Sequence, residues 1–450
     1  MRSILGLWRL LRRRGRHSGH PEQLTSALAV TAFTVATAAL LVVGGGVIAF
    51  VERTDGAGTA SASSAAAHAD QYPTLALIAA GLLLIPLVTL GGAAARLAVA
   101  RRDARLATLR LTGATNGQVI ALASGDAVAQ AATGALLGAV GYVALIPAVA
   151  QLRFQGRTFD YAELWVGLPI MAAAVALVVL VALVSSLAGL RRVAITPLGV
   201  AARTTPPSLR ARRVAIAIVV VAAYLVASNV DGDSAVVIGV LATLLVLGLA
   251  TLNAVGPFVI GVIGRRMVAR ARSVATLLAG RRIVDSPKTA WRCVGGVALA
   301  TFIAGLTSVT AALGDPGGNA GTADEIYRAD LATGGLLTLG IAGILAAVSA
   351  GVMQAGRIID QRDQYRALVH AGTDVQVLHQ ARGRETSVPL LAAVGIATAA
   401  AAVFIVPVLG TGALTDGSVI VRFLLCVAAA TAVTLAGSAA TRPVVRTVLA

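Results

Sequence analysis

The chain is dominated by ten apolar runs, and a helix of about 20 apolar residues is long enough to cross the hydrocarbon core of a membrane. Only 13% of the 450 residues are charged and 57% are hydrophobic, whereas a soluble domain has about a quarter of its residues charged. The runs cover residues 25–51, 73–97, 119–150, 164–190, 214–229, 234–264, 293–314, 331–355, 386–410 and 419–440. We therefore predict an all-α integral membrane protein with about ten transmembrane helices, of which the fifth is short and the sixth long.

The distribution of arginine predicts how these spans are oriented. Nearly all the Arg residues fall in every second connecting segment, and the intervening loops carry a net negative charge. These Arg-rich segments are 1–24, 98–118, 191–213, 265–292, 356–385 and 441–450. Because cytoplasmic loops hold the excess of Lys and Arg, we expect a multi-pass protein of the cytoplasmic membrane with both termini in the cytoplasm. The net charge of +17 then reports topology, and no nucleic-acid partner is expected.

The sequence also predicts an internal repeat, which appears when the chain is shifted by 259 residues. The matched positions include polar and turn residues outside the apolar runs: Leu109 with Leu368, Gly113 with Gly372, and Asp126 with Glu385. This shift relates spans 1–4 to spans 7–10 in the same orientation and gives a 4+2+4 arrangement. The expected units are a basic N-terminal segment (1–24), a first four-helix repeat (25–213), a central helix pair (214–264) and a second four-helix repeat (265–450).

A short basic segment, RRDARLATLRLTGATNGQV (101–119), precedes the third span. Leu106 and Leu109 share one face of a predicted amphipathic helix, and Gly113 ends it as a left-handed C′ residue. Such a helix lies at the membrane interface with its Arg side chains reaching the headgroups. It is either a lipid anchor or a docking element for a cytoplasmic partner. A second copy at the equivalent place favours docking.

These segments carry a family resemblance. The basic segment, the acid Asp126 and GALLGAVGY after it resemble the core of the FtsX-like permeases, the membrane subunits of MacB-type ABC transporters. LAGLRRVAITPLGVAAR (187–203) is similar to the Arg-rich ending of that core, and LLAGRRIVDSPKTAWR (277–292) is similar to the cytoplasmic start of a second permease half. The ten spans in a 4+2+4 arrangement resemble the fused, one-chain form of this family.

The resemblance implies an ABC transporter subunit driven by a separate ATPase, with two copies of the ATPase expected per chain. Its docking residues would lie in the two basic segments: Leu106, Leu109, Gly113, Tyr365, Leu368 and Gly372. The chain itself lacks a Walker A loop, because its one lysine, Lys288, follows Pro287 and not the Gly that this motif requires. We therefore expect no enzymatic activity, no cofactor and no metal site.

The chain departs from many FtsX-like permeases in its outer loops. Residues 55–72 and 314–330 are too short to form the large extracytoplasmic domain that such proteins commonly carry. Three acids in the second loop, Asp324, Glu325 and Asp330, lack the oxygen pattern of a calcium loop. We interpret them as a solvated face.

Glycines suggest where a substrate meets the protein. Gly134, Gly138 and Gly141 lie on the third span, and close packing through Gly allows neighbouring helices to slide. With neither an outer domain nor charges deep in the spans, we expect an opening toward the lipid at these residues. The substrate would be amphipathic or lipid-like, moved by export or by extraction from the membrane.

Two other functions stay open at this point. An ion-coupled secondary transporter usually has ionisable residues near the middle of the bilayer, whereas Asp126, Glu385 and Arg422 all lie near the ends of the runs. Asn253, the main internal polar residue, is interpreted as a packing residue. The other alternative is a sensor or scaffold that signals through a partner ATPase without transporting anything.

Overall fold

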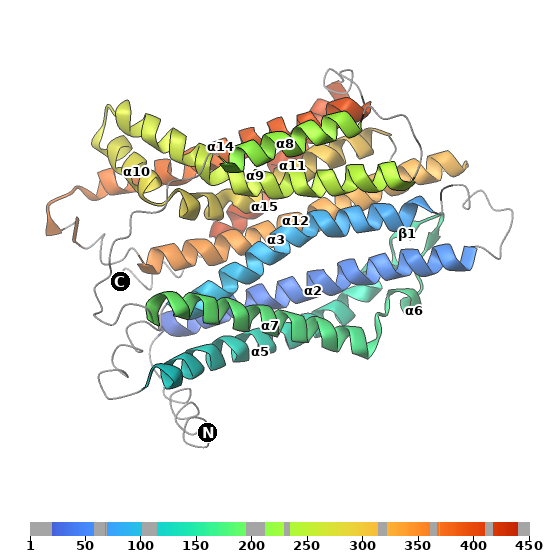
Figure 1. The fold of residues 1–450 in the computed structure, drawn as a ribbon, viewed down its shortest axis with the longest axis horizontal. Coiled ribbons are helices and arrows are strands. Elements are labelled where there is room, and N and C mark those ends of the chain that lie inside the picture. Colours follow the sequence, from blue (N-terminus) through green and yellow to red (C-terminus); the bar gives the residue numbers. More distant parts are fainter. Residues whose placement is uncertain are drawn as a thin grey trace.

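The computed structural model describes residues 20–57, 68, 70–100, 115–194, 212–228, 235–313, 322–360, 367–368, 370–409 and 417–439. Long helices run side by side along the molecule (Figure 1). In chain order these are α2 (His20–Ala57), α3 (Gln71–Ala100), α5 (Asn116–Ala150), α6 (Tyr161–Leu164), α7 (Gly167–Ala194), α8 (Arg212–Ala227), α9 (Ala235–Ala269), α10 (Val274–Asp285), α11 (Pro287–Leu313), α12 (Ala323–Asp360), α14 (Val375–Leu409) and α15 (Gly417–Ala439).

Within the described ranges, eight helices are long and apolar enough to cross a membrane: α2, α3, α5, the α6–α7 segment, α9, α11, α12 and α14. The fifth and tenth predicted runs correspond to shorter apolar stretches, Val214–Ala227 in α8 and Val419–Val433 in α15. Because a helix rises 1.5 Å per residue, the 16 residues of α8 extend about 24 Å, less than the hydrocarbon thickness. The prediction of a multi-pass helical membrane protein is confirmed, and the count of ten spans stays a prediction.

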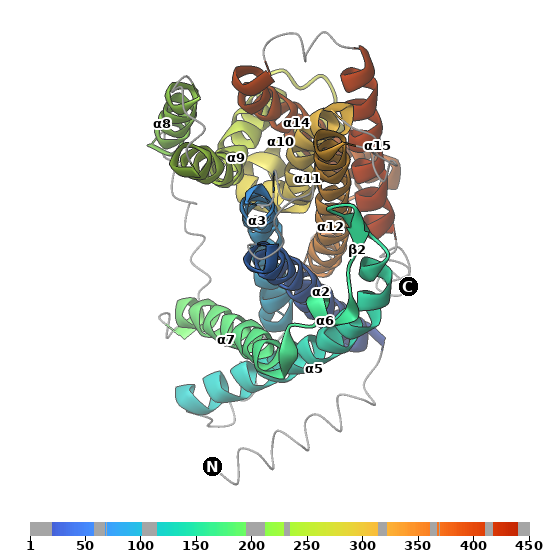
Figure 2. The same ribbon diagram turned by 90° about the vertical axis from the view of Figure 1, so that its right-hand side faces the viewer.

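Seen along the helix axes, the bundle divides into two groups that meet at α3 and α12 (Figure 2). On one side α2 packs against α3 and α5, and α5 packs against α7. On the other side α11 packs against α12, α14 and α15, α9 packs against α11 and α14, and α8 lies outside α9. One continuous apolar core, including Phe33, Leu90, Trp291, Phe302 and Leu345, runs through both groups. Asn253 accepts a 2.7 Å hydrogen bond from Trp291 Nε1, which is a packing role.

The bounds of two helices agree with the predicted repeat. Helix α14 begins and ends 259 residues after α5, and both helices have 35 residues. A polar side chain stands just before each helix at positions 259 residues apart, although the capping bonds differ in span: the Gln118 N–H donates to Thr115 Oγ1 three residues earlier, and the Gln376 N–H donates to Asp374 Oδ1 two residues earlier. A polar side chain at this position satisfies a backbone N–H that has no partner inside the helix. The 4+2+4 arrangement as a whole stays a prediction.

The helical fold contains one short hairpin that the sequence did not predict. Between α5 and α7, β1 (Arg153–Phe154) and β2 (Arg157–Thr158) form an antiparallel hairpin. Its two loop residues, Gln155 and Gly156, have φ of 58° and 74°. Positive φ at both positions defines the turn whose twist suits a two-residue hairpin loop. The hairpin lies at the same end of the bundle as the start of α3 and α12, opposite α10 (Figure 1).

Candidate functional site

A cavity of about 470 Å³ lies where the two helix groups meet. Its walls come mainly from α2, α3 and α12, with further side chains from α8, α9, α11 and α14 and from the hairpin segment. None of the lining residues is classed as exposed. The volume falls within the roughly 300–1,000 Å³ of typical ligand pockets, which are mostly apolar and occur between helices of bundles.

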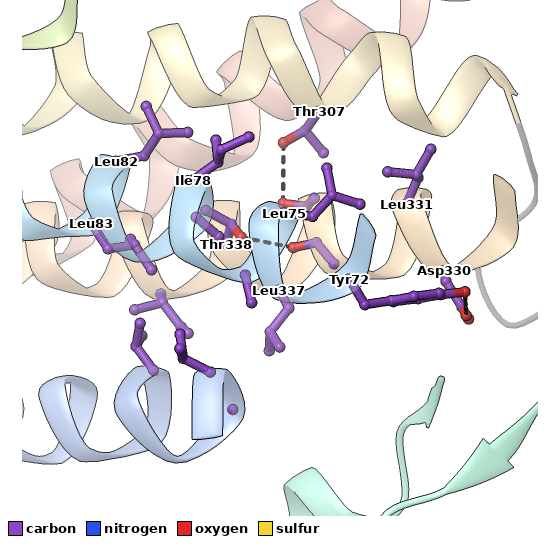
Figure 3. Close-up of a pocket in the computed structure, with 18 of the residues that line it drawn as sticks. Tyr72, Leu75, Ile78, Leu82, Leu83, Thr307, Asp330, Leu331, Leu337 and Thr338 are labelled. Atoms are coloured by element: carbon purple, nitrogen blue, oxygen red, sulfur yellow. Dashed lines mark hydrogen bonds between the residues drawn. The ribbon is translucent and has the colours of Figure 1, made fainter. Parts of the chain in front are cut away.

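The cavity is elongated along α3 and α12. Tyr72 and Leu83 on α3 both line it, as do Asp330 and Ile341 on α12. Each pair is eleven residues apart, which corresponds to about 16 Å along a helix. Figure 3 shows Tyr72 meeting Asp330 toward one end and Leu83 lying toward the other.

The wall of the cavity is almost entirely apolar. Two of its hydroxyl groups are already bonded to main-chain carbonyls of α12: Thr307 Oγ1 donates to Gly335 O at 3.1 Å, and Thr338 Oγ1 donates to Gly334 O at 2.8 Å (Figure 3). Asp330 is the one charged residue among those that line it. The cavity can therefore hold an apolar chain along most of its length and can recognise a polar group at the Asp330 end.

Asp330 corrects the sequence interpretation of a solvated acidic face. It is only 7% exposed, and its Oδ2 accepts a 2.6 Å hydrogen bond from the Tyr72 hydroxyl and a 2.7 Å hydrogen bond from the Gln155 N–H. Asp324 and Glu325 are exposed, as expected. Asp324 nevertheless pairs with His68 at 2.9 Å. Asp330 therefore joins α12 to α3 and to the turn of the hairpin.

The hairpin is held to α2 by Arg53, which is 7% exposed. The guanidinium donates to Phe154 O at 3.2 Å and to Thr158 O at 3.0 Å. It also donates to Glu163 Oε2, from Nη2 at 2.6 Å and from Nε at 3.1 Å, and its carbon lies 4.0 Å from the centre of the Phe159 ring. Since Phe154 and Phe159 line the cavity, Arg53 fixes the side chains that close its hairpin end.

Residues 151–163 lie between the third and fourth predicted runs, where the arginine distribution predicts an outer loop, and this group of contacts was not expected there. Two signals were present. The segment RFQGRTF has aromatic residues on either side of Gln155-Gly156, and glycine in a two-residue loop is a hairpin signal. Asp160 and Glu163 have the spacing of a capping pair, and Glu163 Oε2 accepts from the Asp160 N–H at 3.2 Å. Neither signal predicts that Arg53, a hundred residues earlier, contacts the hairpin.

The predicted glycines lie in the contact between α5 and α2. A Cβ atom on Gly138 would be 2.5 Å from Thr34 O, and a Cβ on Gly134 would be 2.6 Å from Phe33 Cβ. At Gly141 the nearest atom would be at an ordinary 3.9 Å. Gly134 and Gly138 thus allow two helices to approach closely. A part for these residues in a lateral opening stays a prediction.

Most of the predicted docking residues lie outside the described part of the chain. These are Leu106, Leu109, Gly113 and Tyr365. The two described ones are Leu368, which is partly buried, and Gly372, which is exposed with φ of 84°. The Thr373 N–H donates to Leu368 O at 3.0 Å, the bond of a helix that ends at a left-handed glycine. The glycine break is therefore present in the second copy, and the docking role of all six residues stays a prediction.

Near this segment, α10 is fixed to α14 by side chains. The Ser273 hydroxyl caps the start of α10 and accepts a 2.7 Å hydrogen bond from Arg384. Arg282 lies 3.5 Å from Glu385, whose side chain is 4% exposed. Through this ion pair Glu385 joins α14 to α10, at the end of the bundle opposite the hairpin. Glu385 is also the predicted repeat partner of Asp126.

Comparison with known families identifies part of the chain. Residues 92–198 match the family "FtsX-like permease C-terminal". The matched range contains the first basic segment, α5, the hairpin, α6 and α7, whereas the second basic segment, α14 and α15 lie outside it. A comparison with curated proteins gave no match.

The family match covers residues 92–198, and the eight apolar helices extend over much of the described chain. The chain is a membrane protein in which residues 92–198 are similar to FtsX-like permeases and several helices are able to span a bilayer. This family suggests a permease subunit of an ABC transporter, and its members typically pair with an ATPase.

Proposed function

We propose that the chain is the permease subunit of a MacB-type ABC transporter, with both permease halves fused in one chain. A separate ATPase would drive export or extraction of an amphipathic or lipid-like substrate. The FtsX-like match at residues 92–198 carries this proposal. Helices α5 and α14 have the same length, and both ends of α14 lie 259 residues after those of α5. This agreement supports a second, divergent permease half in the region that the family match does not cover.

The cavity supports the proposed class of substrate. It lies between the two helix groups, where the path of a transporter with two parallel repeats runs. Its long apolar wall suits an alkyl chain, and its single acidic residue suits a polar head at one end. The substrate would enter from the bilayer, and the glycine contact between α2 and α5 would allow these helices to shift as it does so.

Coupling would run through the two basic segments, each contacting one copy of the ATPase on the cytoplasmic side. Leu109 and Leu368 occupy equivalent positions in these segments. An aspartate introduced at either position would place a charge in an apolar contact, which costs several kcal/mol unless the charge is paired. A double substitution should therefore release the ATPase.

The experiment first asks whether a neighbouring reading frame encodes an ATP-binding-cassette protein, and then tests whether that protein co-purifies with the chain. The Leu109→Asp, Leu368→Asp double variant should reach the membrane normally, lose the ATPase and lose stimulated ATP hydrolysis. Leu277→Asp is the matched control, because Leu277 is an apolar residue of α10 that is 41% exposed and lies outside both of these segments. Normal ATPase association in the double variant would disprove docking and leave these segments as lipid anchors.

A further inference from the structure

The carboxyl group of Asp330 accepts hydrogen bonds, but it forms no ion pair with any cation in the part of the chain that the structure describes. Both groups bonded to its Oδ2, the Tyr72 hydroxyl and the Gln155 N–H, are neutral. Among the described residues, the ion pairs join other acids and never Asp330. Burying a carboxylate without a counter-ion costs free energy. An ionisable residue inside a membrane protein is therefore a candidate functional residue, and the group that pairs with it has to be identified.

Arg53 does not fill this role. It lies close enough to attract the Asp330 carboxylate electrostatically. Its hydrogen bonds, however, go to Glu163 and to the carbonyls of Phe154 and Thr158. Glu163 binds Arg157 as well, at 3.0 Å. The Arg53 guanidinium is thus already paired with Glu163 and bonded to the carbonyls of the hairpin segment.

The surroundings of Asp330 suit a positively charged group. Tyr72 and Tyr327 both line the same end of the cavity, and their rings lie edge to face with centres 5.8 Å apart. Aromatic faces attract ammonium groups, most strongly where water is excluded. An anion at this place would meet the carboxylate, and an uncharged head would leave it without a counter-ion.

The rest of the cavity limits the remainder of the ligand. From Asp330 to Ile341 the lined length is about 16 Å. An extended alkyl chain advances roughly 1.25 Å per bond of about 1.5 Å, so about a dozen carbons fit this length. Lipid tails are as apolar as the cavity. The tail therefore gains little on leaving the bilayer, and the head decides which amphiphile is preferred.

We propose that the cavity binds an amphiphile with a cationic amine head, which pairs with Asp330, and with an alkyl tail that lies along α3 and α12. The inference deepens the proposed function by naming the substrate class. An amine-bearing membrane lipid and a free amphipathic amine share this chemistry.

The test measures binding of three amphiphiles with one tail: dodecylamine, dodecanol and dodecanoate. The full chain is placed in nanodiscs of an uncharged galactolipid, and binding of tritiated dodecylamine is followed by scintillation proximity. Dodecylamine should bind saturably, and neither of the other two should displace it at equal concentration. Equal displacement by dodecanol or dodecanoate would overturn the proposal, and this comparison needs no variant.

Substitutions then place the site. Asp330→Asn keeps an oxygen that can accept from Tyr72 and Gln155, but it removes the charge and should weaken dodecylamine binding about 10- to 100-fold. Asp324→Asn is the matched control, because this acid is also near the start of α12 but is exposed and outside the cavity. Thr338→Trp should fill the cavity and abolish binding. Unchanged affinity in the Asp330 or the Thr338 variant would refute the assignment.

A final arm identifies the source of the amine. Replacing part of the galactolipid by phosphatidylethanolamine should displace dodecylamine if the occupant is a membrane lipid, and should leave binding unchanged if it is a free amphipathic amine. Either result agrees with a site for an amine. The assay contains no ATPase, so a chain that binds its ATPase but does not prefer the cation would retain the proposed function and lose this inference.

Discussion

Replacing Arg53 by Met should detach the hairpin from α2. The variant loses four hydrogen bonds: two to Glu163, one to Phe154 O and one to Thr158 O. Removing one partner of a buried ion pair costs about 3–5 kcal/mol. We take the lower end, about 3 kcal/mol, because Glu163 keeps Arg157 as a partner and is 19% exposed, so its charge is not stranded.

This loss of stabilising free energy should appear as faster amide hydrogen exchange in the hairpin. Since about 1.4 kcal/mol corresponds to a factor of ten in an equilibrium, opening of the hairpin should become about a hundredfold more frequent. The assay is amide exchange followed by mass spectrometry on peptides covering residues 151–164. Protection should fall by about two orders of magnitude there and stay unchanged in α11, which packs mainly against α12, α14, α15 and α9.

Arg157→Met provides the matched control. Arg157 binds the same carboxylate as Arg53, with a similar distance of 3.0 Å, but its side chain is 55% exposed. Exposed ion pairs contribute roughly 0–1 kcal/mol, so exchange in the hairpin should rise no more than about fivefold. If the two variants exchange at the same rate, burial is not what makes Arg53 important, and the reasoning fails.

Two further predictions concern topology and packing. In a cysteine-free background, Thr322→Cys should react with an impermeant thiol reagent in intact cells, and Gln376→Cys should not. The reason is that the arginine distribution places these two exposed positions on opposite sides of the membrane. The reverse labelling pattern would overturn the predicted orientation. Gly138→Ala should lower the thermal unfolding temperature, because its Cβ would lie 2.5 Å from Thr34 O and overpacking costs about 1–3 kcal/mol, whereas Gly141→Ala should be tolerated. Equal unfolding temperatures for the two alanine variants would contradict the close contact between α2 and α5.

The sequence predicted the helices because the requirement for a membrane span is local: enough consecutive apolar residues to cross the bilayer. All ten predicted runs correspond to helices of the structure. The helix bounds were less predictable, and α14 begins at Val375, eleven residues before the predicted run, because polar residues at the interface continue the same helix.

The site was harder to predict because its contacts join distant parts of the chain. Arg53 meets Glu163 across 110 residues, and Tyr72 meets Asp330 across 258 residues. A charged residue close to the end of an apolar run is typical of a solvated boundary, which was the interpretation of Asp330. Only the pairing of α3 with α12 turns that residue inward. The cavity follows from the same pairing and has no sequence signal of its own.

The length and proline-free sequence of α12 allow it to transmit force along the bundle. It is 38 residues long with no proline among them, and Asp330 near one end is about 45 Å from Asp360 at the other. Asp360 immediately precedes residues 361–380, the segment that the 259-residue shift matches to the first basic segment. Both hydrogen bonds of Asp330 go to the opposite helix group. A stiff rod of this kind can act as a lever that passes force applied beside Asp360 to the two hydrogen bonds of Asp330. If those bonds broke, Asp330 would move with α12, and the hairpin would stay on α2 through the bonds of Arg53.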